Sequence, residues 1–409
     1  MDVSALLRWG TIVLIALTLS GCGESEVEPQ EKLQTPSATC SSLAIQNKFI
    51  VHWKDGSMSV EQSEDSDAFV KGFMTENNED ISWAEHDYIV KQYRPVTSPI
   101  ASTVNAEVGW GQARVQVQDV WNQGIRGQNV IVAVIDSGVD INHPQLVNQI
   151  YKNPNESENG IDDDGNGLID DVYGYDFERN QAYVSDGTGH GTHVSGIVAG
   201  DHSVGNIKGI APDAKIIPLD FMNSKGEGAL SDAVRAMNYA ASMGATVINA
   251  SWGGAPCSDS LASAIKNLER QGVMIVVASG NNGLNLDVRP EFPAAYNFNN
   301  QITVGASSPN DFTADFSNYS NQLVDIVAPG VSIYSTYTIP GERYLDGTSM
   351  AAPFVSGAVA LLKSHRPLAT LQEIKSALLT TVDAGPYPVA TRGRLNIKKA
   401  IETLETLVP

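Results

Sequence analysis

From about Trp110 onward the chain alternates short apolar runs with amphipathic segments, and this alternation constrains the possible folds most strongly. The apolar runs are typical of strands buried on both faces, and the segments between them repeat apolar residues at helical spacing. Strands that alternate with helices predict an α/β domain with a central parallel sheet and right-handed crossovers. In such sheets the chemistry gathers in loops past the carboxyl ends of the strands. We expect strands at 129–135, 215–220, 245–250, 273–278 and 302–304, and helices at 230–243 and 261–271.

Length, charge and cysteine content narrow the functional classes. The 409 residues allow more than one domain, and a hydrophobic content of 42% predicts a large core. The 26 basic and 47 acidic residues give a net charge of −21. Nucleic acid is therefore not an expected partner, because phosphate contacts need clustered Lys and Arg. Three cysteines are too few for a disulfide framework.

The N-terminus is typical of an exported protein. Arg8 precedes an apolar run, Thr11 to Leu19, which is too short to cross a bilayer as a helix and ends in small residues followed by Cys22. This ending resembles the bacterial lipoprotein box, which implies a signal peptide over residues 1–21, lipidation of Cys22 and a membrane anchor. An ordinary secretory signal with an incidental cysteine is the alternative. Residues 22–47 are polar and predict a flexible tether.

A small module lies between the tether and the α/β domain. Short strand-like runs and one helical segment predict an α+β unit, and a linker with two prolines follows it. We expect the unit at 48–93, with strands at 48–53, 81–83 and 88–90 and a helix at 67–74, and the linker at 94–109.

Three polar residues stand where the predicted architecture favours chemistry. Asp136 directly follows an apolar strand, His190 lies between two glycines, and Ser349 precedes an apolar segment in which Pro353 fits the first turn of a helix. Free N–H groups at a helix N-terminus favour a developing anion. Each residue also has an ordinary explanation, as a turn residue, a core histidine or an N-cap. His190 and His193 could together bind a metal, but no Glu lies between them as in a zinc protease motif.

Together the three residues are more specific than any one of them. A serine hydroxyl needs an imidazole to take its proton, and the imidazole needs a carboxylate to fix its tautomer and stabilise its cation. The segments that contain them, 134–140, 190–196 and 347–353, resemble the three signatures of the subtilisin-like serine protease family, in the same Asp, His, Ser order. The resemblance extends from about residue 110 to 400.

The resemblance implies a function and a fold. Residues 110–409 would be a three-layer subtilisin-like catalytic domain that hydrolyses peptide bonds of polypeptide substrates through an acyl-enzyme, without a cofactor for catalysis. Asp136, His190 and Ser349 would be its catalytic residues, because the family's histidine is the first of the two. The G-x-S-x-G elbow of α/β-hydrolases is disfavoured, since Ala351 replaces the second glycine.

The resemblance also assigns residues around the triad. Asn281 corresponds to the oxyanion asparagine, with the Ser349 N–H as the second donor and the Thr348 hydroxyl in support; on its own, the Asn-Asn-Gly sequence predicts only a turn. The substrate-binding edges correspond to the stretch from Leu219 to Leu230 and to Ser251, Trp252, Gly253 and Gly254. Glycines there let an extended peptide pair with the enzyme backbone.

An acidic loop predicts a calcium site. Residues 152–180 hold nine acids and two bases, and their order follows the first half of an EF-hand loop, with oxygen ligands at alternate positions and Gly167 at the sharp turn. Position twelve is Tyr173 rather than Glu, so a bidentate ligand must come from elsewhere. A solvated charge run is the alternative. The expected ligands of a structural calcium ion are Asp162, Asp164, Asn166, Leu168, Asp170 and Asp171. A second family calcium site is in doubt, because Gln145 replaces its Asp.

The resemblance gives residues 48–93 a role. Family members carry an N-terminal prodomain that assists folding and blocks the active site, so the chain's own prodomain is an expected inhibitory partner. An unrelated spacer is the alternative. Two other functions stay open: a non-catalytic surface binding protein on the same scaffold, and a processing protease of narrow specificity.

Overall fold

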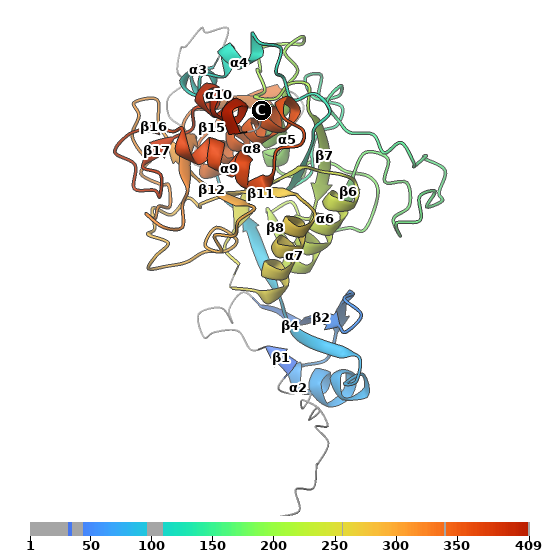
Figure 1. Cartoon of the computed structure of the whole chain (residues 1–409). Coiled ribbons are helices and arrows are strands. Elements are labelled where there is room, and N and C mark those ends of the chain that lie inside the picture. The colour runs from blue at the N-terminus through green and yellow to red at the C-terminus, as the bar shows by residue number, and fades with distance from the viewer. Residues whose placement is uncertain (1–31, 35–43, 96–108, 256, 339–340, 408–409) are drawn as a thin grey trace, which may run out of the picture.

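The computed structural model describes residues 32–34, 44–95, 109–255, 257–338 and 341–407. A small N-terminal unit lies at one end of a large α/β domain (Figure 1). The predicted signal peptide, Cys22, most of the tether and most of the linker lie outside the described residues. Within the described part of the chain, no helix is both long and apolar enough to span a membrane.

The large domain is built on one sheet, which confirms the predicted α/β fold. Its nine strands within the described residues follow the order β16-β17-β13-β12-β11-β9-β5-β7-β6. Neighbours are parallel except β16 and β17. The strands are β5 (Ile131–Asp136), β6 (Tyr175–Asp176), β7 (Lys215–Asp220), β9 (Val247–Ala250), β11 (Met274–Ala278), β12 (Gln301–Ser307), β13 (Ile326–Pro329), β16 (Asp383–Ala384) and β17 (Gly393–Arg394).

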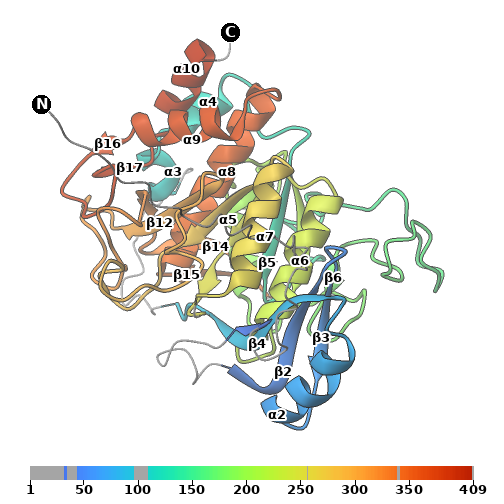
Figure 2. The same cartoon turned by 60° about the horizontal axis from the view of Figure 1, so that its bottom comes forward.

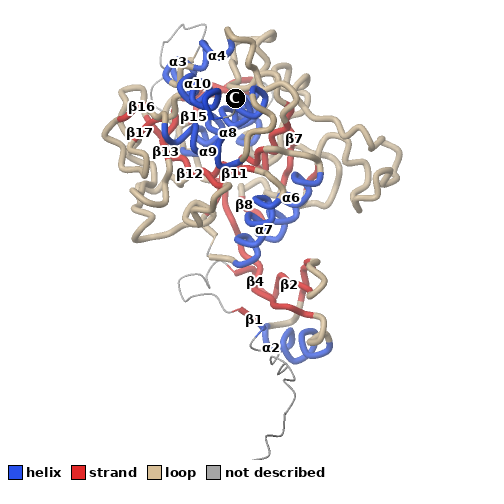
Figure 3. The backbone as a smooth tube through the Cα atoms, viewed as in Figure 1, coloured by secondary structure: helices blue, strands red, loops and turns tan. Residues whose placement is uncertain are grey.

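Helices cover both faces of this sheet and make three layers (Figure 3). Side chains of β5 alternate between the faces: Val132 and Val134 pack in a core with α5 and α8, while Ala133 and Ile135 pack in a second core with α6 and α7. The helices are α3 (Trp110–Arg114), α4 (Val117–Trp121), α5 (His190–Ala199), α6 (Leu230–Ser242), α7 (Asp259–Arg270), α8 (Thr348–His365), α9 (Leu371–Thr380) and α10 (Ile397–Leu407).

One detail of α8 differs from the prediction. The helix begins at Thr348, so Pro353 lies in its second turn and not in its first. Proline has no N–H to donate to the carbonyl four residues earlier. That carbonyl belongs to Ser349, and it accepts a hydrogen bond from Ser251 Oγ at 3.0 Å instead. The proline therefore leaves a backbone oxygen free to connect α8 with the segment after β9.

The N-terminal unit has its own small core. Phe49, Phe69, Met74 and Ile81 are fully or almost fully buried between an antiparallel sheet and a short helix. The elements are β1 (Leu33–Gln34), β2 (Ala44–Trp53), β3 (Met58–Gln62), α2 (Ser66–Ala68), the π-helical turn η2 (Phe69–Met74) and β4 (Ile81–Gln92). Two differences from the prediction concern strands: β2 begins at Ala44, and the two expected strands at 81–83 and 88–90 are one continuous strand.

Strand β4 is long because it serves both units. Its first half pairs with β2, and its last residues pair antiparallel with β8 (Glu227–Ala229) and β10 (Trp252–Gly253) of the large domain. Figure 2 shows the small sheet beside α6 and α7. A second hairpin, β14 (Ile333–Tyr337) with β15 (Gly341–Leu345), packs on α5. The acidic loop after β5 projects from the body of the domain (Figure 1).

Candidate active site

Asp136 and His190 form a buried hydrogen-bonded pair. Asp136 ends β5 and is 0% exposed, and His190 begins α5 and is 1% exposed. His190 Nδ1 donates to Asp136 Oδ1 at 2.7 Å, and the Ser137 N–H donates to the same oxygen at 2.8 Å. The bond from Nδ1 places the free lone pair of a neutral imidazole on Nε2, the atom that a general base uses.

A close approach between α5 and β5 makes this pair possible. Gly191 allows it, because a Cβ at this position would stand 2.0 Å from the Gly138 carbonyl oxygen. Asp186 holds the first turn of α5 in place: its carboxylate accepts from the N–H groups of Thr188, Gly189 and Thr192 at 2.7–3.0 Å. Burial raises the pKa of Asp186 above its ordinary value, and these hydrogen bonds only partly oppose the rise.

Ser349 lies in the first turn of α8 and is fully buried. Its hydroxyl donates to the Ser251 carbonyl oxygen at 3.1 Å. Within the described residues, His190 Nε2 is buried and has no hydrogen-bond partner. The serine hydroxyl therefore points to the segment after β9, and the imidazole nitrogen of His190 is available to accept a proton.

Asn281 is held by Thr348, the residue before the serine. Asn281 Oδ1 accepts from the Thr348 N–H at 2.9 Å and from the Thr348 hydroxyl at 2.8 Å. The Thr348 hydroxyl oxygen in turn accepts from the Gly280 N–H at 3.1 Å. Because the amide oxygen is used in this way, Nδ2 points away as a donor, and it bonds the Arg94 carbonyl at 3.3 Å. This is the arrangement expected of an oxyanion donor.

The two edges that pair with β4 correspond to the predicted substrate-binding edges. Gly253 lies opposite Lys91 on one side, and Gly228 lies opposite Val90 on the other. Trp252 contributes only its backbone, because its ring is fully buried and donates to the Ile135 carbonyl. Gly254 follows directly and has a positive φ of 81°.

Leu219 does not belong to these edges. It lies inside β7, hydrogen-bonded between β5 and β6, and its side chain is 0% exposed. The prediction placed it at the start of a substrate-binding stretch, but a strand with a partner on each side cannot pair with a peptide. The edge is formed by β8, which comes later in the same stretch.

His193 is a core residue. Its Nε2 donates to the Arg343 carbonyl at 2.9 Å, and burial lowers the pKa of the ring to about 3. This supports the core interpretation over the alternative of a metal ligand shared with His190.

The acidic loop brings together a set of oxygen ligands. Glu156, Asp162 and Asp164 each offer a carboxylate oxygen within 4.8 Å of the others. Asp162 also accepts from the N–H groups of Gly165 and Gly167 at 2.7 and 2.8 Å. Burial raises the pKa of Glu156. Hard oxygen atoms at this spacing fit a calcium ion.

The other predicted ligands have separate roles in the loop. Asp170 accepts from the N–H groups of Asn159 and Gly160. Asp171 is 0% exposed and accepts from Tyr239 and from the Asn166 side chain. Leu168 N–H donates to Asn166. Gln145, at the position of the doubtful second site, bonds the backbone of the segment around Ile207.

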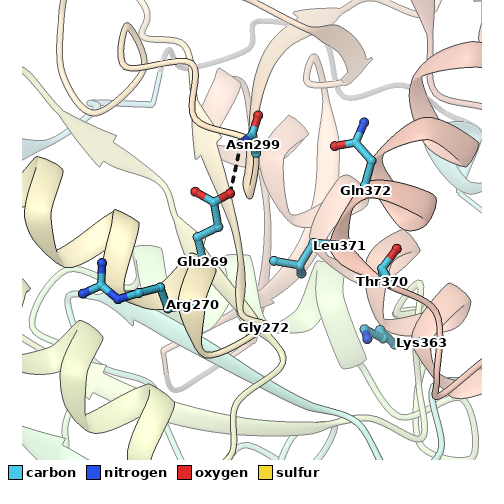
Figure 4. A pocket seen from close by; sticks show the side chains of 8 residues that line it. All are labelled: Glu269, Arg270, Gly272, Asn299, Lys363, Thr370, Leu371 and Gln372. Carbon is cyan, nitrogen blue, oxygen red and sulfur yellow. Dashed lines mark hydrogen bonds between the residues drawn. The ribbon is translucent and has the colours of Figure 1, made fainter.

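Sequence reasoning missed three residues of these sites. The sequence does not single out Asp186 and Glu156, because only the folded loops bring them to α5 and to the carboxylate cluster. Glu291 precedes a turn and lies beside Asn282, which donates to it at 3.2 Å. A separate pocket between α7 and α9 shares none of these residues (Figure 4); it is lined by Glu269, Arg270, Gly272, Asn299, Lys363, Thr370, Leu371 and Gln372.

The fold and the site geometry are those of a serine-type hydrolase, and comparisons with known proteins identify the family. The profile described as "Subtilase family" matches residues 127–398. The chain is 38% identical over 276 residues to the major intracellular serine protease of Bacillus subtilis (strain 168), an alignment that spans 66% of this chain and 79% of the relative. It is 33% identical over 297 residues to thermitase of Thermoactinomyces vulgaris (72% and 95%) and 36% identical over 276 residues to subtilisin BL of Lederbergia lenta (67% and 91%).

The chain therefore belongs to the subtilase family, and it is a serine-type endopeptidase that acts on polypeptides. This confirms the predicted family and enzyme class.

Proposed function

We propose that this protease uses Ser349 as nucleophile, His190 as general base and Asp136 to orient the histidine. The observation that carries the proposal is the 2.7 Å bond between Asp136 and His190, together with the buried Nε2, which has no partner within the described residues, and the packing of α5 against α8. The mechanism requires the Ser349 hydroxyl to exchange its bond to the Ser251 carbonyl for one to Nε2 by a rotation about the Cα–Cβ bond.

The reaction then has two halves. Ser349 Oγ attacks the scissile carbonyl while His190 takes its proton, and the imidazolium is stabilised by Asp136. The tetrahedral oxyanion accepts hydrogen bonds from Asn281 Nδ2 and the Ser349 N–H, at the positive end of α8. His190 then protonates the leaving amine, and the acyl-enzyme forms. In the second half, water attacks the acyl-enzyme while His190 takes its proton, and His190 returns the proton to Ser349 as the acid product leaves.

Replacement of the nucleophile tests this mechanism. Ser349→Ala is expected to abolish hydrolysis of a denatured protein substrate and to leave the precursor uncut when expressed alone. The control is Ser364→Ala, near the far end of α8. Normal processing of purified Ser349→Ala protein would show that the chain does not cut itself.

We also propose that residues 48–93 are an inhibitory prodomain and that the enzyme is made as a zymogen. Two of its carboxylates cap helices of the catalytic domain: Glu85 accepts from the Ser258 hydroxyl at 2.6 Å and the Ser260 N–H at 3.0 Å, and Asp87 accepts from the Ser231 N–H at 3.0 Å. The end of β4 occupies the two substrate edges. A peptide substrate cannot use these edges until this strand leaves.

Two further proposals concern calcium and location. The loop carboxylates of Glu156, Asp162 and Asp164 would hold a calcium ion that stabilises the fold. The sequence features of the N-terminus support export from a bacterial cell, with a lipid on Cys22 as the membrane anchor. Cleavage at the start of the 94–109 linker would separate the catalytic domain from that anchor unless the prodomain stays bound.

A further inference from the structure

The side chain of Tyr93 fills a pocket beside the catalytic residues. Tyr93 follows the last paired residue of β4 and is only 8% exposed. Its hydroxyl lies over Gly253: a Cβ on this glycine would stand 2.0 Å from the phenolic oxygen and 2.7 Å from the ring carbon that bears it. Any larger residue at 253 would displace the ring tip. Asn281 bonds the carbonyl of Arg94, the residue after Tyr93, so it is the pairing of β4 with both edges, and not this bond, that places Tyr93 as the scissile-side residue.

The pocket has an acidic residue at its base. A Cβ on Gly280, the residue before Asn281, would stand 2.7 Å from Glu291 Oε2. The carboxylate therefore lies against the backbone of Gly280. Asn282 Nδ2 donates to Oε1 at 3.2 Å, and Asn318 Nδ2 donates to Oε2 at 3.0 Å. The carboxylate is thus fixed in place by two amides and still has acceptor capacity.

The tyrosine hydroxyl and this carboxylate interact electrostatically. Burial raises the pKa of Tyr93, and the charge of Glu291 raises it further. Burial also raises the pKa of Glu291, against the effect of its hydrogen bonds. Within the described residues, the buried Tyr93 hydroxyl has no hydrogen bond of normal geometry. The two groups are close enough that a hydrogen bond between them raises the pKa of Tyr93 and lowers that of Glu291.

We propose that Glu291 makes this protease selective for a scissile-side residue whose tip donates a hydrogen bond, that is tyrosine, lysine or arginine, over phenylalanine and leucine. The inference rests on the proposed function, because Tyr93 models a substrate residue only if the end of β4 lies in a true active site. A substrate side chain with an apolar end removes water from the Glu291 carboxylate and gives it no hydrogen bond in return. A side chain that ends in a hydroxyl or a cation replaces the lost water with a hydrogen bond. Acidic tips are excluded by like charge.

The test uses peptides that copy the bound strand. Val-Lys-Gln-X p-nitroanilides carry the sequence of residues 90–92, with X as Tyr, Phe, Lys, Arg, Leu or Glu, and kcat/KM is measured with the processed enzyme. Wild type is expected to prefer Tyr over Phe, and Lys or Arg over Leu, by roughly ten- to a hundredfold. This comparison needs no variant, so a folding defect cannot obscure it.

Variants then assign the preference to one side chain. Glu291→Ala should bring Tyr and Phe within about threefold of each other, and Glu291→Gln should lose the preference for Lys and Arg first, because its amide oxygen still accepts from tyrosine. Glu269→Gln, in the separate pocket of Figure 4, is the matched control and should keep the wild-type profile.

A phosphonylating active-site reagent separates the possible failures. If wild type is labelled at Ser349 but cleaves Phe as fast as Tyr, or if the Glu291 variants keep the wild-type profile, the selectivity proposal is overturned. If no label enters Ser349 and no peptide is cut, the proposed function fails instead.

Discussion

At the scale of single residues, the position of the Asn281 amide is decided by Thr348. Both hydrogen bonds from Thr348 go to the amide oxygen, so the nitrogen can only face outward, where a developing oxyanion would lie. Nothing in the sequence Asn-Asn-Gly distinguishes this residue from its neighbour. Asn282 instead points to Glu291, so two adjacent asparagines serve two different parts of the site.

Removing the Asn281 side chain should therefore affect the transition state and not substrate binding. Asn281→Ala is expected to lower kcat by roughly 10²–10³ with little change in KM, because the oxyanion exists only near the transition state. Thr348→Val, which removes only the orienting hydroxyl, should cause a smaller loss in kcat. Steady-state kinetics on one peptide substrate measure both. A change mainly in KM would assign Asn281 to ground-state binding.

At the scale of elements, the sequence allowed most of the catalytic domain to be predicted. Strands such as β5 and β11 are short apolar runs, and the end of β5 places Asp136 where an α/β sheet collects chemistry. The prediction for Leu219 was wrong because pairing of β7 with a strand on each side buries this residue, which its residue type does not reveal. The chain turns back after β7, and only then does β8 form the edge. Glu156 and Glu291 could not be found, since each is joined to its site only by tertiary contacts.

The acidic loop is an element with few apolar anchors, so its stability should depend on a cation. Without one, the clustered carboxylates of Glu156, Asp162 and Asp164 repel each other, and an ion that binds only the folded state stabilises it by mass action. Raising free calcium from the chelated state to 100 times its Kd should stabilise wild type by about 2.7 kcal/mol and raise its Tm by several degrees.

Melting temperature against free calcium, for wild type and Asp162→Ala/Asp164→Ala, is the measurement. The double variant should melt lower and respond weakly to calcium. Glu158→Ala, an exposed acid of the same loop, is the control and should respond as wild type does. An equal calcium response in the double variant and wild type would show that the ion binds elsewhere. The loop would then be interpreted as a run of solvated charges.

At the scale of the whole molecule, the interface between the N-terminal unit and the catalytic domain contains a titratable group. His52 Nε2 bonds the Ser260 hydroxyl at 2.8 Å, and its ring stacks on Trp83. Burial lowers the pKa of His52 to about 4, while nearby Asp259 acts in the opposite direction. Docking thus favours the neutral ring, so its contribution is complete above pH 6.5 and is lost as the pH falls towards 4. Glu85 acts in the opposite direction, because burial raises its pKa. Its contribution to docking is complete below pH 4.5 and weakens as the pH rises above that value.

The pKa shift of His52 is the larger of the two, so acid should weaken inhibition by the proposed prodomain. In a purified self-cleaved complex, the inhibition constant is expected to rise several-fold from pH 7 to pH 5, because in this window His52 of the released unit takes up a proton whereas docked His52 stays neutral. His52→Gln should flatten this dependence, and His365→Gln, whose ring pairs with Glu405 on α10, should not. Parallel pH profiles for wild type and His52→Gln would remove His52 from the release of the prodomain.

The central claim is that Ser349 is a nucleophile activated by His190, and the most direct test is covalent labelling of the processed enzyme. A phosphonylating reagent, followed by peptide mass mapping, should give one adduct per chain, on Ser349. His190→Ala, matched with His365→Ala, should slow the labelling by at least about a thousandfold, because the hydroxyl then has no base to take its proton. An adduct on another residue, or equal labelling rates in His190→Ala and wild type, would contradict the account.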